Sequence, residues 1–373
     1  MNLDKEKLNV IGIDRIKIYV KLVSINTRIN ADCYSLAVNE AKKYCEVYDC
    51  ATDRNVKLSG LEYGKTIAGA ENKDNISYGL SLDRLTKNKA ILDVVLPRVV
   101  YGTVHNIYNV IEKEVIIESL QCIVEELKAE GMIVNDLAEW EVYSMEINKT
   151  IVSEKPLVSY REGMLWLLDK VFFSGYTKKD DDCKSRLKDG SISNTYYYGT
   201  KRIGKKIYDK TAQIKDTLEI YIKENMIRSE VTYNKEAIER AFESTKLQDV
   251  LDEEKIRELY NKSTKVLGDC LKEFAEKTIC ELERKFTRAN YKEIDKVYKE
   301  NATKIFDIIF MLEATRRAYK KYGNGNVSRD IKKLLKCYDT SMYGKYKELS
   351  NILIAFNDSI EVTNFDKINK YFQ

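Results

Sequence analysis

Three acidic residues stand inside runs of apolar residues that are typical of β-strands. Asp93 lies in "ILDVVL", Glu146 in "YSMEIN" and Glu230 in "IRSEVTY". An ionised carboxylate is rarely placed among core residues unless it is paired or binds a metal ion. Mg²⁺ and Mn²⁺ prefer oxygen ligands, and acids on adjacent strands of one sheet can converge on one ion. The pattern predicts a divalent-metal site; the alternative is that each acid faces solvent on a half-exposed sheet.

Basic residues crowd around Tyr208, one of 26 tyrosines in the chain. Residues 178–210 contain ten Lys or Arg against five Asp, an excess of five positive charges. A phenol has a pKa of about 10 and must lose its proton before it attacks. Lys206 and Lys210 would favour the phenolate, and a metal ion at the acids would polarise a phosphodiester. The setting suits a nucleophilic tyrosine, although a two-stranded ribbon with an exposed lysine face would look alike.

The same segment joins positive charge to the aromatic run "TYYYG". Phosphates attract the charges, and bases can stack on the rings. The residues that we predict to contact DNA are Lys201, Arg202, Lys205, Tyr197 and Arg228.

The chain has a single histidine, His105, in "YGTVHNIYNV". It follows the Asp93 strand at or just before a predicted helix, which makes it a candidate metal ligand; a structural hydrogen-bonding role is the alternative. One histidine and eight scattered cysteines without a CxxC pair do not form a zinc set.

A sheet is needed to bring these residues together. Alternating β-branched residues predict strands over residues 8–23, 89–100, 139–151 and 226–234. The segment "NTYYYGTKRIGKKIYDK" predicts a hairpin, with Gly199 and Gly204 in its turn. Helical spacing covers residues 106–131 and ends at Gly131.

The amino-acid composition of the sequence changes near residue 245. Residues 248–322 are nearly free of glycine and are rich in Lys and Glu, which predicts long amphipathic helices. We therefore predict the α+β class, with an antiparallel-sheet domain over residues 1–244 and an all-helical domain over residues 245–373.

The overall charge is only mildly basic, with 63 Lys and Arg against 59 Asp and Glu and a net charge of +4. The field of the whole protein does not indicate nucleic acid, so any basic surface must be local. No stretch of the sequence approaches the roughly 18 apolar residues that cross a bilayer, and the charged N-terminus has no signal-peptide core. We expect a cytoplasmic protein without a membrane partner.

The order of these pieces resembles the rolling-circle replication initiators of filamentous phages (the gene two endonucleases) and related plasmid and conjugative-element initiators. In that superfamily a strand acid precedes a "G(x)nHN" stretch, here Asp93 and "YGTVHNIYNV", and a second strand acid, here Glu146, follows a long helix. An "(I/V/A)Y-x-K" segment then carries the tyrosine, here "IYDK" ending at Lys210, and an "(I/V)R-x-E" strand follows, here "IRSE" ending at Glu230.

The resemblance covers roughly residues 8–242 in the same order. It implies a fold related to the histidine-hydrophobe-histidine endonucleases, with a carboxylate-based metal site. The chain departs from the pattern at Met145, where many relatives carry Ile or Leu, at Ser229, where an aromatic residue is frequent, and in lacking an Arg often found near the second acid. These departures concern the metal ligands more than the tyrosine.

The function implied by the resemblance is site-specific nicking and joining of single-stranded DNA that initiates rolling-circle replication of a plasmid or phage. Tyr208 would form a 5′-phosphotyrosine link and release a 3′-OH, while Lys206 and Lys210 steady the phosphate. The implied ligands of Mg²⁺ or Mn²⁺ are Glu146, Glu230, Asp93 and His105. The implied partner is origin DNA, and a host helicase and a homodimer are left open.

Four alternatives accompany this interpretation. The same chemistry serves a relaxase of a mobile element. A non-catalytic DNA-binding protein could keep the fold, but would leave the tyrosine and the acids unexplained. A nuclease that uses water would leave no covalent protein–DNA adduct. A helical scaffold protein with an unrelated sheet domain would leave the strand acids without a role.

Overall fold

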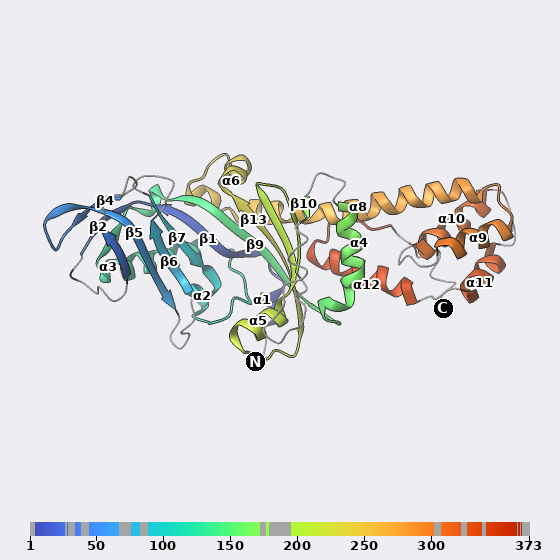
Figure 1. Cartoon of the computed structure of the whole chain (residues 1–373), viewed down its shortest axis with the longest axis horizontal. Helices are drawn as coiled ribbons and strands as arrows, with labels where there is room; N and C mark the ends of the chain where they lie inside the picture. The colour runs from blue at the N-terminus through green and yellow to red at the C-terminus, as the bar shows by residue number, and fades with distance from the viewer. Residues whose placement is uncertain are drawn as a thin grey trace. The chain divides into compact units, whose positions relative to one another are not determined.

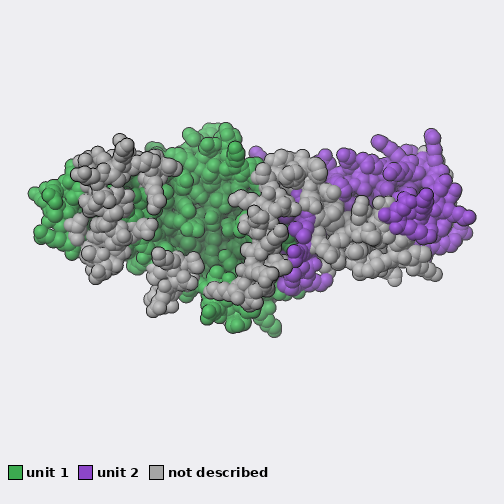
Figure 2. All heavy atoms as spheres, in the orientation of Figure 1, with its two compact units in different colours: residues 1–154, 180–260 green, residues 155–179, 261–373 purple. Residues whose placement is uncertain are grey.

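The computed structural model describes residues 4–26, 28, 34–38, 45–66, 76–82, 89–171, 177–178, 195–301, 307–321, 327–337, 341–363, 365 and 367. The chain divides into two compact units (Figure 2). The first unit comprises residues 1–154 and 180–260, and the second comprises residues 155–179 and 261–373.

The first unit is built on a large, mainly antiparallel sheet (Figure 1). Its strands follow the order β11-β12-β13-β9-β1-β7-β6-β5-β4-β2-β8, and β3 pairs with β5 beside this path. β2 and β4 pair in parallel. The strand bounds are β1 Gly12–Val20, β2 Leu22–Ile25, β3 Tyr34–Val38, β4 Cys45–Asp49, β5 Arg54–Thr66, β6 Ile76–Leu82, β7 Ala90–Val95, β8 Met132–Val134, β9 Glu141–Ser153, β11 Thr195–Gly199, β12 Ile203–Asp209 and β13 Asn225–Asn234.

Helices pack against this sheet and join its strands. Their bounds are α1 Lys5–Leu8, α2 Leu96–Tyr101, α3 Lys113–Ala129, η2 Leu137–Glu139, α5 Lys210–Leu218, α6 Lys235–Phe242 and α7 Leu247–Val250. The apolar stripe of α3, which includes Ile116 and Leu120, is buried in one cluster with Ile16 and Ile18 of β1. Alternation along a strand then leaves the other face of the central strands for polar side chains.

The second unit is mainly helical. It contains η3 Leu157–Tyr160, α4 Arg161–Val171, β10 Thr177–Lys178, α9 Tyr291–Asn301, α10 Asp307–Lys321, α11 Val327–Cys337 and α12 Ser341–Phe356. The long helix α8, Glu253–Phe286, begins in the first unit and continues into the second. Gly268 of α8 packs so closely on Ile360 that a Cβ at this position would clash with the isoleucine side chain.

The α+β class, the antiparallel sheet and the helical C-terminal region confirm the predicted fold class, whereas the relation to a particular nuclease fold stays a prediction. The predicted strand over residues 89–100 is wrong beyond Val95, because residues 96–101 form α2 with Pro97 in its first turn. Proline lacks the N–H that a strand needs but suits a helix start. The predicted helix over residues 106–131 begins only at Lys113.

The compact units do not coincide with the composition change near residue 245. Residues 155–179 belong to the second unit, and the first unit continues to Tyr260. Leu247, Ile256 and Tyr260 are buried in the core of the first unit. A division of function at residue 244 stays a prediction. Among the described residues, no helix is long and apolar enough to span a membrane.

Candidate active site

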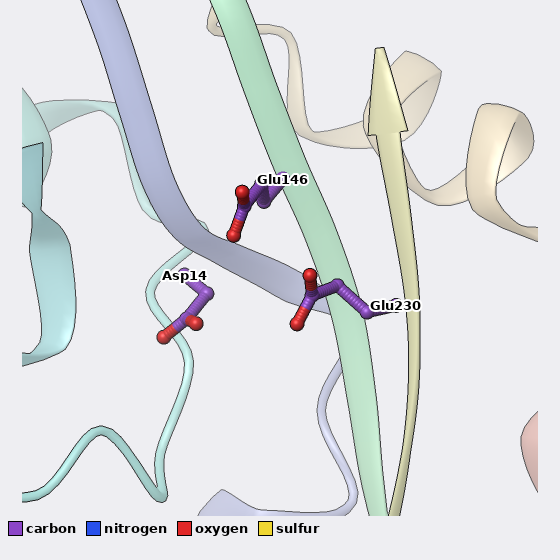
Figure 3. Close-up of side chains that lie close together, drawn as sticks. All are labelled: Asp14, Glu146 and Glu230. Carbon is purple, nitrogen blue, oxygen red and sulfur yellow. The ribbon is translucent and has the colours of Figure 1, made fainter. Parts of the chain in front are cut away.

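Asp14, Glu146 and Glu230 bring their carboxylates together (Figure 3). They come from β1, β9 and β13, which are neighbours in the sheet. One oxygen from each lies within 4.8 Å of the others. Asp14 and Glu230 are only 4% and 1% exposed. Among the described residues, these three acids, called the acid cluster below, form the group that could hold a metal ion.

Strand alternation explains why Glu146 and Glu230 share a face. Glu146 stands between Met145 and Ile147, which are both buried in the sheet core, so its side chain leaves from the opposite face. Glu230 lies opposite Asn148 in the β9–β13 register, two positions along β9 from Glu146. Diagonal neighbours on one face of an antiparallel pair are close enough for long side chains to meet.

Asp14 joins the cluster through a β-bulge in β1. In the register with β9, Ile13 lies opposite Ile147 but Arg15 lies opposite Glu146, which leaves Asp14 as an extra residue. Bulges re-aim side chains and are frequent beside active sites. Here the bulge lets Asp14 and Arg15 both leave the core face while Ile13 stays in it.

Two cations stand against these carboxylates. Lys206 of β12 lies directly opposite Glu230 and forms an ion pair with it. The Nη1 atom of Arg228 lies 3.4 Å from Asp14 Oδ2, and the arginine is completely buried. Three carboxylates therefore face two cations, a surplus of negative charge that a divalent cation would neutralise.

Glu146 is the carboxyl that this surplus affects most. Burial raises the pKa of Glu146 to about 7, and the neighbouring Glu230 carboxylate adds to the rise while Lys206 opposes it. A proton and a metal ion would therefore compete for Glu146 near neutral pH.

Tyr208 of β12 points into the same cluster. Its hydroxyl donates to Glu230 Oε2 at 3.3 Å, and the side chain is 6% exposed. Burial raises the pKa of the Tyr208 phenol and the Glu230 carboxylate raises it further, whereas Arg228 and Lys206 lower it. A metal ion at the acid cluster would add positive charge beside the phenol and ease the loss of its proton.

Lys206 and Lys210 differ more than the sequence suggests. The Nζ atom of Lys206 lies 5.3 Å from the centre of the Tyr208 ring and is paired with Glu230. Lys210 is wholly buried at the start of α5, with its Nζ bonded to the side chains of Asn106 and Gln213. Burial and the Arg228 charge hold the pKa of Lys210 well below its usual range. The Nζ atom of Lys210 also lies 5.9 Å from the centre of the Tyr208 ring, and its role beside the phenol stays a prediction.

Asp93 and His105 lie outside the acid cluster. Asp93 faces Arg15, which donates to both carboxylate oxygens at 2.6 Å, and it also forms an ion pair with Lys17. His105 is buried in the loop between α2 and α3, and its Nδ1 has no hydrogen-bond partner among the described residues. Burial lowers the pKa of His105, and the charge of Lys210 lowers it further. Their role as metal ligands stays a prediction that this geometry does not favour.

The residues predicted to contact DNA lie in three different settings. Lys201 and Arg202 are exposed in the turn of the β11–β12 hairpin, where Arg202 also pairs with Glu236. Tyr197 lies opposite Lys206 in the register, on the face of the acid cluster.

Lys205 and Arg228 do not offer a charge to the surface. Lys205 is 4% exposed, and its Nζ lies 5.5 Å from the centre of the Tyr198 ring. Arg228 is held by Thr150 Oγ1 and by the carbonyls of Asn106 and Ile107. Because its guanidinium is buried against these groups, Arg228 is part of the site's interior rather than of a DNA-facing surface.

Two residues of the site were missed by sequence reasoning. Asp14 in "IGIDRI" is a strand acid between apolar residues, the same signal that singled out the other three acids. Asn148 is completely buried on the face of the cluster, opposite Glu230, and neither polar atom of its amide has a hydrogen-bond partner among the described residues. Nothing in the sequence marks a neutral amide of this kind.

The donor set fits a hard divalent cation. Three carboxylates and the unsatisfied carbonyl oxygen of Asn148 are oxygen donors, which suit Mg²⁺ or Mn²⁺ and not a thiolate-seeking metal. A buried amide without a partner costs free energy, and a bound ion with its water ligands would satisfy it.

Comparisons with known proteins give a distant likeness among solved structures. No family model matches the chain, and no curated protein matches it. Among solved structures the chain is similar to a rolling circle replication initiator protein from Geobacillus stearothermophilus, with 12% sequence identity and a TM-score of 0.30 over 65% of this chain and 80% of that one. At so low an identity and TM-score, the functional argument rests on the site itself.

Proposed function

We propose that the protein nicks and rejoins one strand of DNA, with Tyr208 as the nucleophile, and so initiates rolling-circle replication of a plasmid or phage. The observation that carries the proposal is the hydrogen bond from the Tyr208 hydroxyl to Glu230, a member of a buried cluster of three carboxylates. A nucleophile in contact with its proton acceptor, beside a site for a divalent cation, is the arrangement that phosphoryl transfer requires.

Asp14, Glu146 and Glu230 would hold Mg²⁺ or Mn²⁺, with Asn148 as a neutral donor. The bound ion would supply Lewis-acid polarisation of the scissile phosphate and stabilise charge on the leaving oxygen. Lys206, the less buried of the two lysines near Tyr208, would add positive charge beside the phosphate.

The protein groups perform the proton transfer and the attack. The phenol proton passes from Tyr208 to Glu230 as the phenolic oxygen forms a bond to phosphorus. The bond from phosphorus to the 3′ oxygen breaks, the 3′ oxygen takes up a proton from solvent, and the products are a 5′-phosphotyrosine and a free 3′-OH. Attack by a 3′-OH on the phosphotyrosine reverses these steps and joins the strand.

Exposed basic residues beside the site would hold the strand. Lys201 and Arg202 lie in the hairpin turn of the β-ribbon that carries Tyr208, and Tyr197 offers a ring on the same face. Origin DNA is the proposed partner. A host helicase, a homodimer and a role as a relaxase rest on the sequence resemblance alone and stay predictions.

The decisive experiment uses a supercoiled plasmid that carries the coding region with its flanking DNA. We expect the wild-type protein with Mn²⁺ to produce nicked circles with protein attached to the 5′ end of the cut strand. Tyr208→Phe removes only the hydroxyl and should abolish both products while the fold is kept.

Tyr197→Phe is the matched control, because this tyrosine stands on the same face one strand away. It should still form the covalent adduct. Loss of the adduct in Tyr197→Phe alone would move the nucleophile to Tyr197. Nicking without any adduct would favour hydrolysis by water, and intact plasmid with retained binding would favour a non-catalytic DNA-binding protein.

A further inference from the structure

Asn106 contacts Asp14 through its side-chain amide. The Nδ2 atom of Asn106 lies 2.9 Å from Oδ1 and 2.8 Å from Oδ2 of Asp14. Asn106 lies in the irregular segment between α2 and α3, whereas Asp14 is the bulged residue of β1. The Asn106 amide therefore donates to both carboxylate oxygens of Asp14. Asp14 is the member of the acid cluster that was not predicted from the sequence.

Lys210 sets the direction of that amide. Its Nζ donates to Asn106 Oδ1 at 2.7 Å and to Gln213 Oε1 at 2.9 Å. With the amide oxygen taken by this donor, the amide nitrogen must face Asp14, because a flipped amide would set an oxygen against the carboxylate.

The peptide backbone of Asn106 is fixed as well. Arg228 Nη2 donates to the carbonyl oxygens of Asn106 and Ile107 at 2.6 and 2.7 Å. Ile107 is packed in a small apolar cluster with Ile214 of α5. Lys210 itself stands at the first position of α5, where Asp209 caps the helix by accepting from the Ala212 N–H.

We propose that Asn106 is a positioning residue that, oriented by Lys210, holds the Asp14 carboxylate in the direction required to bind the divalent cation. The inference rests on the proposed function, since it concerns the same metal site. Asn106 supplies no ligand of its own. Its neutral N–H group fixes Asp14 without adding charge and leaves the remaining lone pairs of the carboxylate for the ion.

The physical need for such a residue comes from the bulge. Asp14 lacks the regular strand pairing that fixes its neighbours, and a carboxylate beside two others is repelled by them. A hydrogen-bond donor that bridges both oxygens opposes this repulsion. Partners of this kind typically change metal affinity by roughly 10–100-fold.

The test is Mn²⁺ binding to the purified full-length protein, measured by the electron paramagnetic resonance of free Mn²⁺, together with plasmid nicking as a function of Mn²⁺ concentration. Asn106→Leu removes the donor and the acceptor without adding charge. We expect a Kd for Mn²⁺ about tenfold higher, a matching rise in the Mn²⁺ concentration for half-maximal nicking, and a nicking rate that recovers at saturating Mn²⁺. A merely structural loss would lower the rate at every concentration.

Gln213→Met is the matched control, because Gln213 accepts the other hydrogen bond of Lys210 and has no contact with Asp14 among the described residues. Its Kd should stay within about twofold of the wild type, since no ligand-positioning group is changed. Combining Asn106→Leu with Asp14→Asn provides the second test. If Asn106 acts through Asp14, the double variant should bind Mn²⁺ no more weakly than Asp14→Asn alone.

The outcomes separate this inference from the proposed function. Mn²⁺ binding and nicking by the wild type, weakened by Asp14→Asn but unchanged by Asn106→Leu, would overturn the inference and leave the proposed function standing. Additive losses in the double variant would overturn it as well. A wild type that neither binds Mn²⁺ nor nicks DNA would overturn both. If Asn106→Leu does not fold, Asn106→Ser replaces it, and the same changes in Kd decide.

Discussion

Buried acids occur in both units of the molecule, and their surroundings differ. Glu313 of α10 is 3% exposed and accepts from Arg316 at 2.7 Å and from Arg317 at 2.9 Å, one turn further along the same helix. Although burial alone raises it, these arginines bring the pKa of Glu313 below its usual range. In the acid cluster of the first unit, by contrast, burial and a neighbouring carboxylate raise the pKa of Glu146 to about 7.

The difference teaches how to recognise a functional acid. Glu313 takes its partners from its own helix at the spacing of three and four residues, so local structure alone satisfies it. The acid cluster gathers three carboxylates from three strands, and beside it the Asn148 amide has no hydrogen-bond partner among the described residues. Like charges concentrated at a buried point lower the free energy of unfolding, and they form a binding site for a cation.

The largest contrast is expected between Glu230→Gln and Glu313→Gln. Removing the carboxylate that contacts the Tyr208 hydroxyl should lower plasmid nicking by at least about a hundredfold, the usual scale for a proton acceptor. Glu313→Gln should cost about 1–3 kcal/mol of stability by removing the buried charge that pairs with Arg316 and Arg317, and should leave nicking by the folded protein unchanged. The measurement is the nicking rate of each variant at a temperature below the melting temperatures of both. Equal rates for the two variants would contradict the functional difference between the two buried acids.

Metal binding should stabilise the first unit through the acid cluster. At a free Mn²⁺ concentration of 100 times its Kd, the wild type should gain about 2.7 kcal/mol in the free energy of unfolding. Glu146→Gln should lose most of this gain, and chelation should remove it and abolish nicking.

Asp93→Asn provides the control, because Asp93 also carries a strand carboxylate but is paired with Arg15 and Lys17. It should keep the stabilisation by Mn²⁺. Thermal unfolding with and without Mn²⁺ measures the stabilisation. If Asp93→Asn is no longer stabilised by Mn²⁺, Asp93 is a metal ligand.

The contribution of Glu146 to the stability of the metal-free protein should fall as the pH rises from about 4.5 to about 7. The pKa of Glu146 is raised in the folded state, so the folded protein holds a proton that the unfolded chain has already released. Its contribution is fully present below the unfolded pKa and is lost as pH rises through the folded one. One pKa unit corresponds to about 1.4 kcal/mol, so the total change is of order 3–4 kcal/mol.

Glu146→Gln should flatten this part of the pH profile, whereas Glu313→Gln should not, because the pKa of Glu313 is shifted the other way. Urea denaturation at pH 5, 6 and 7 in the presence of chelator measures it. A pH profile of Glu146→Gln with the same slope as that of the wild type over this range would contradict the assignment of the proton to Glu146.

Part of the site was visible in the sequence. The strand around Glu146, the hairpin around Tyr208 and the strand around Glu230 have clear alternation, and the structure places all three residues together. Asp14 was missed because a bulge interrupts the alternation of β1, and register between distant strands cannot be read from one sequence.

The remaining misses have similar causes. Asp93 has the same local signal as the other acids, but its pairing with Arg15 depends on the β1–β7 register. Asn106 and Asn148 are neutral residues whose importance lies in contacts with segments far away in the sequence. The boundary predicted at residue 244 follows the change in composition, whereas the first compact unit continues to Tyr260, because the last residues of its core come after that change.

The smallest expected effect concerns residues 261–373 of the second unit, whose removal should change recognition and not chemistry. The acid cluster and Tyr208 all belong to the first unit, so a protein ending at residue 260 should cut a single-stranded oligonucleotide at the nick site within a few-fold of the full-length rate. It should bind duplex origin DNA several-fold more weakly, because the lysine-rich helices no longer contribute phosphate contacts.

A protein ending at residue 244 is the informative control. It lacks Leu247, Ile256 and Tyr260, which are buried in the core of the first unit, so it should melt at a lower temperature. Cleavage rate and duplex affinity are compared at one salt concentration, since phosphate contacts depend on salt. If the protein ending at 260 binds the duplex as tightly and selectively as the full chain, origin recognition belongs to the first unit. The helical unit would then serve a protein partner, and the comparison between the two units becomes one between catalysis and assembly.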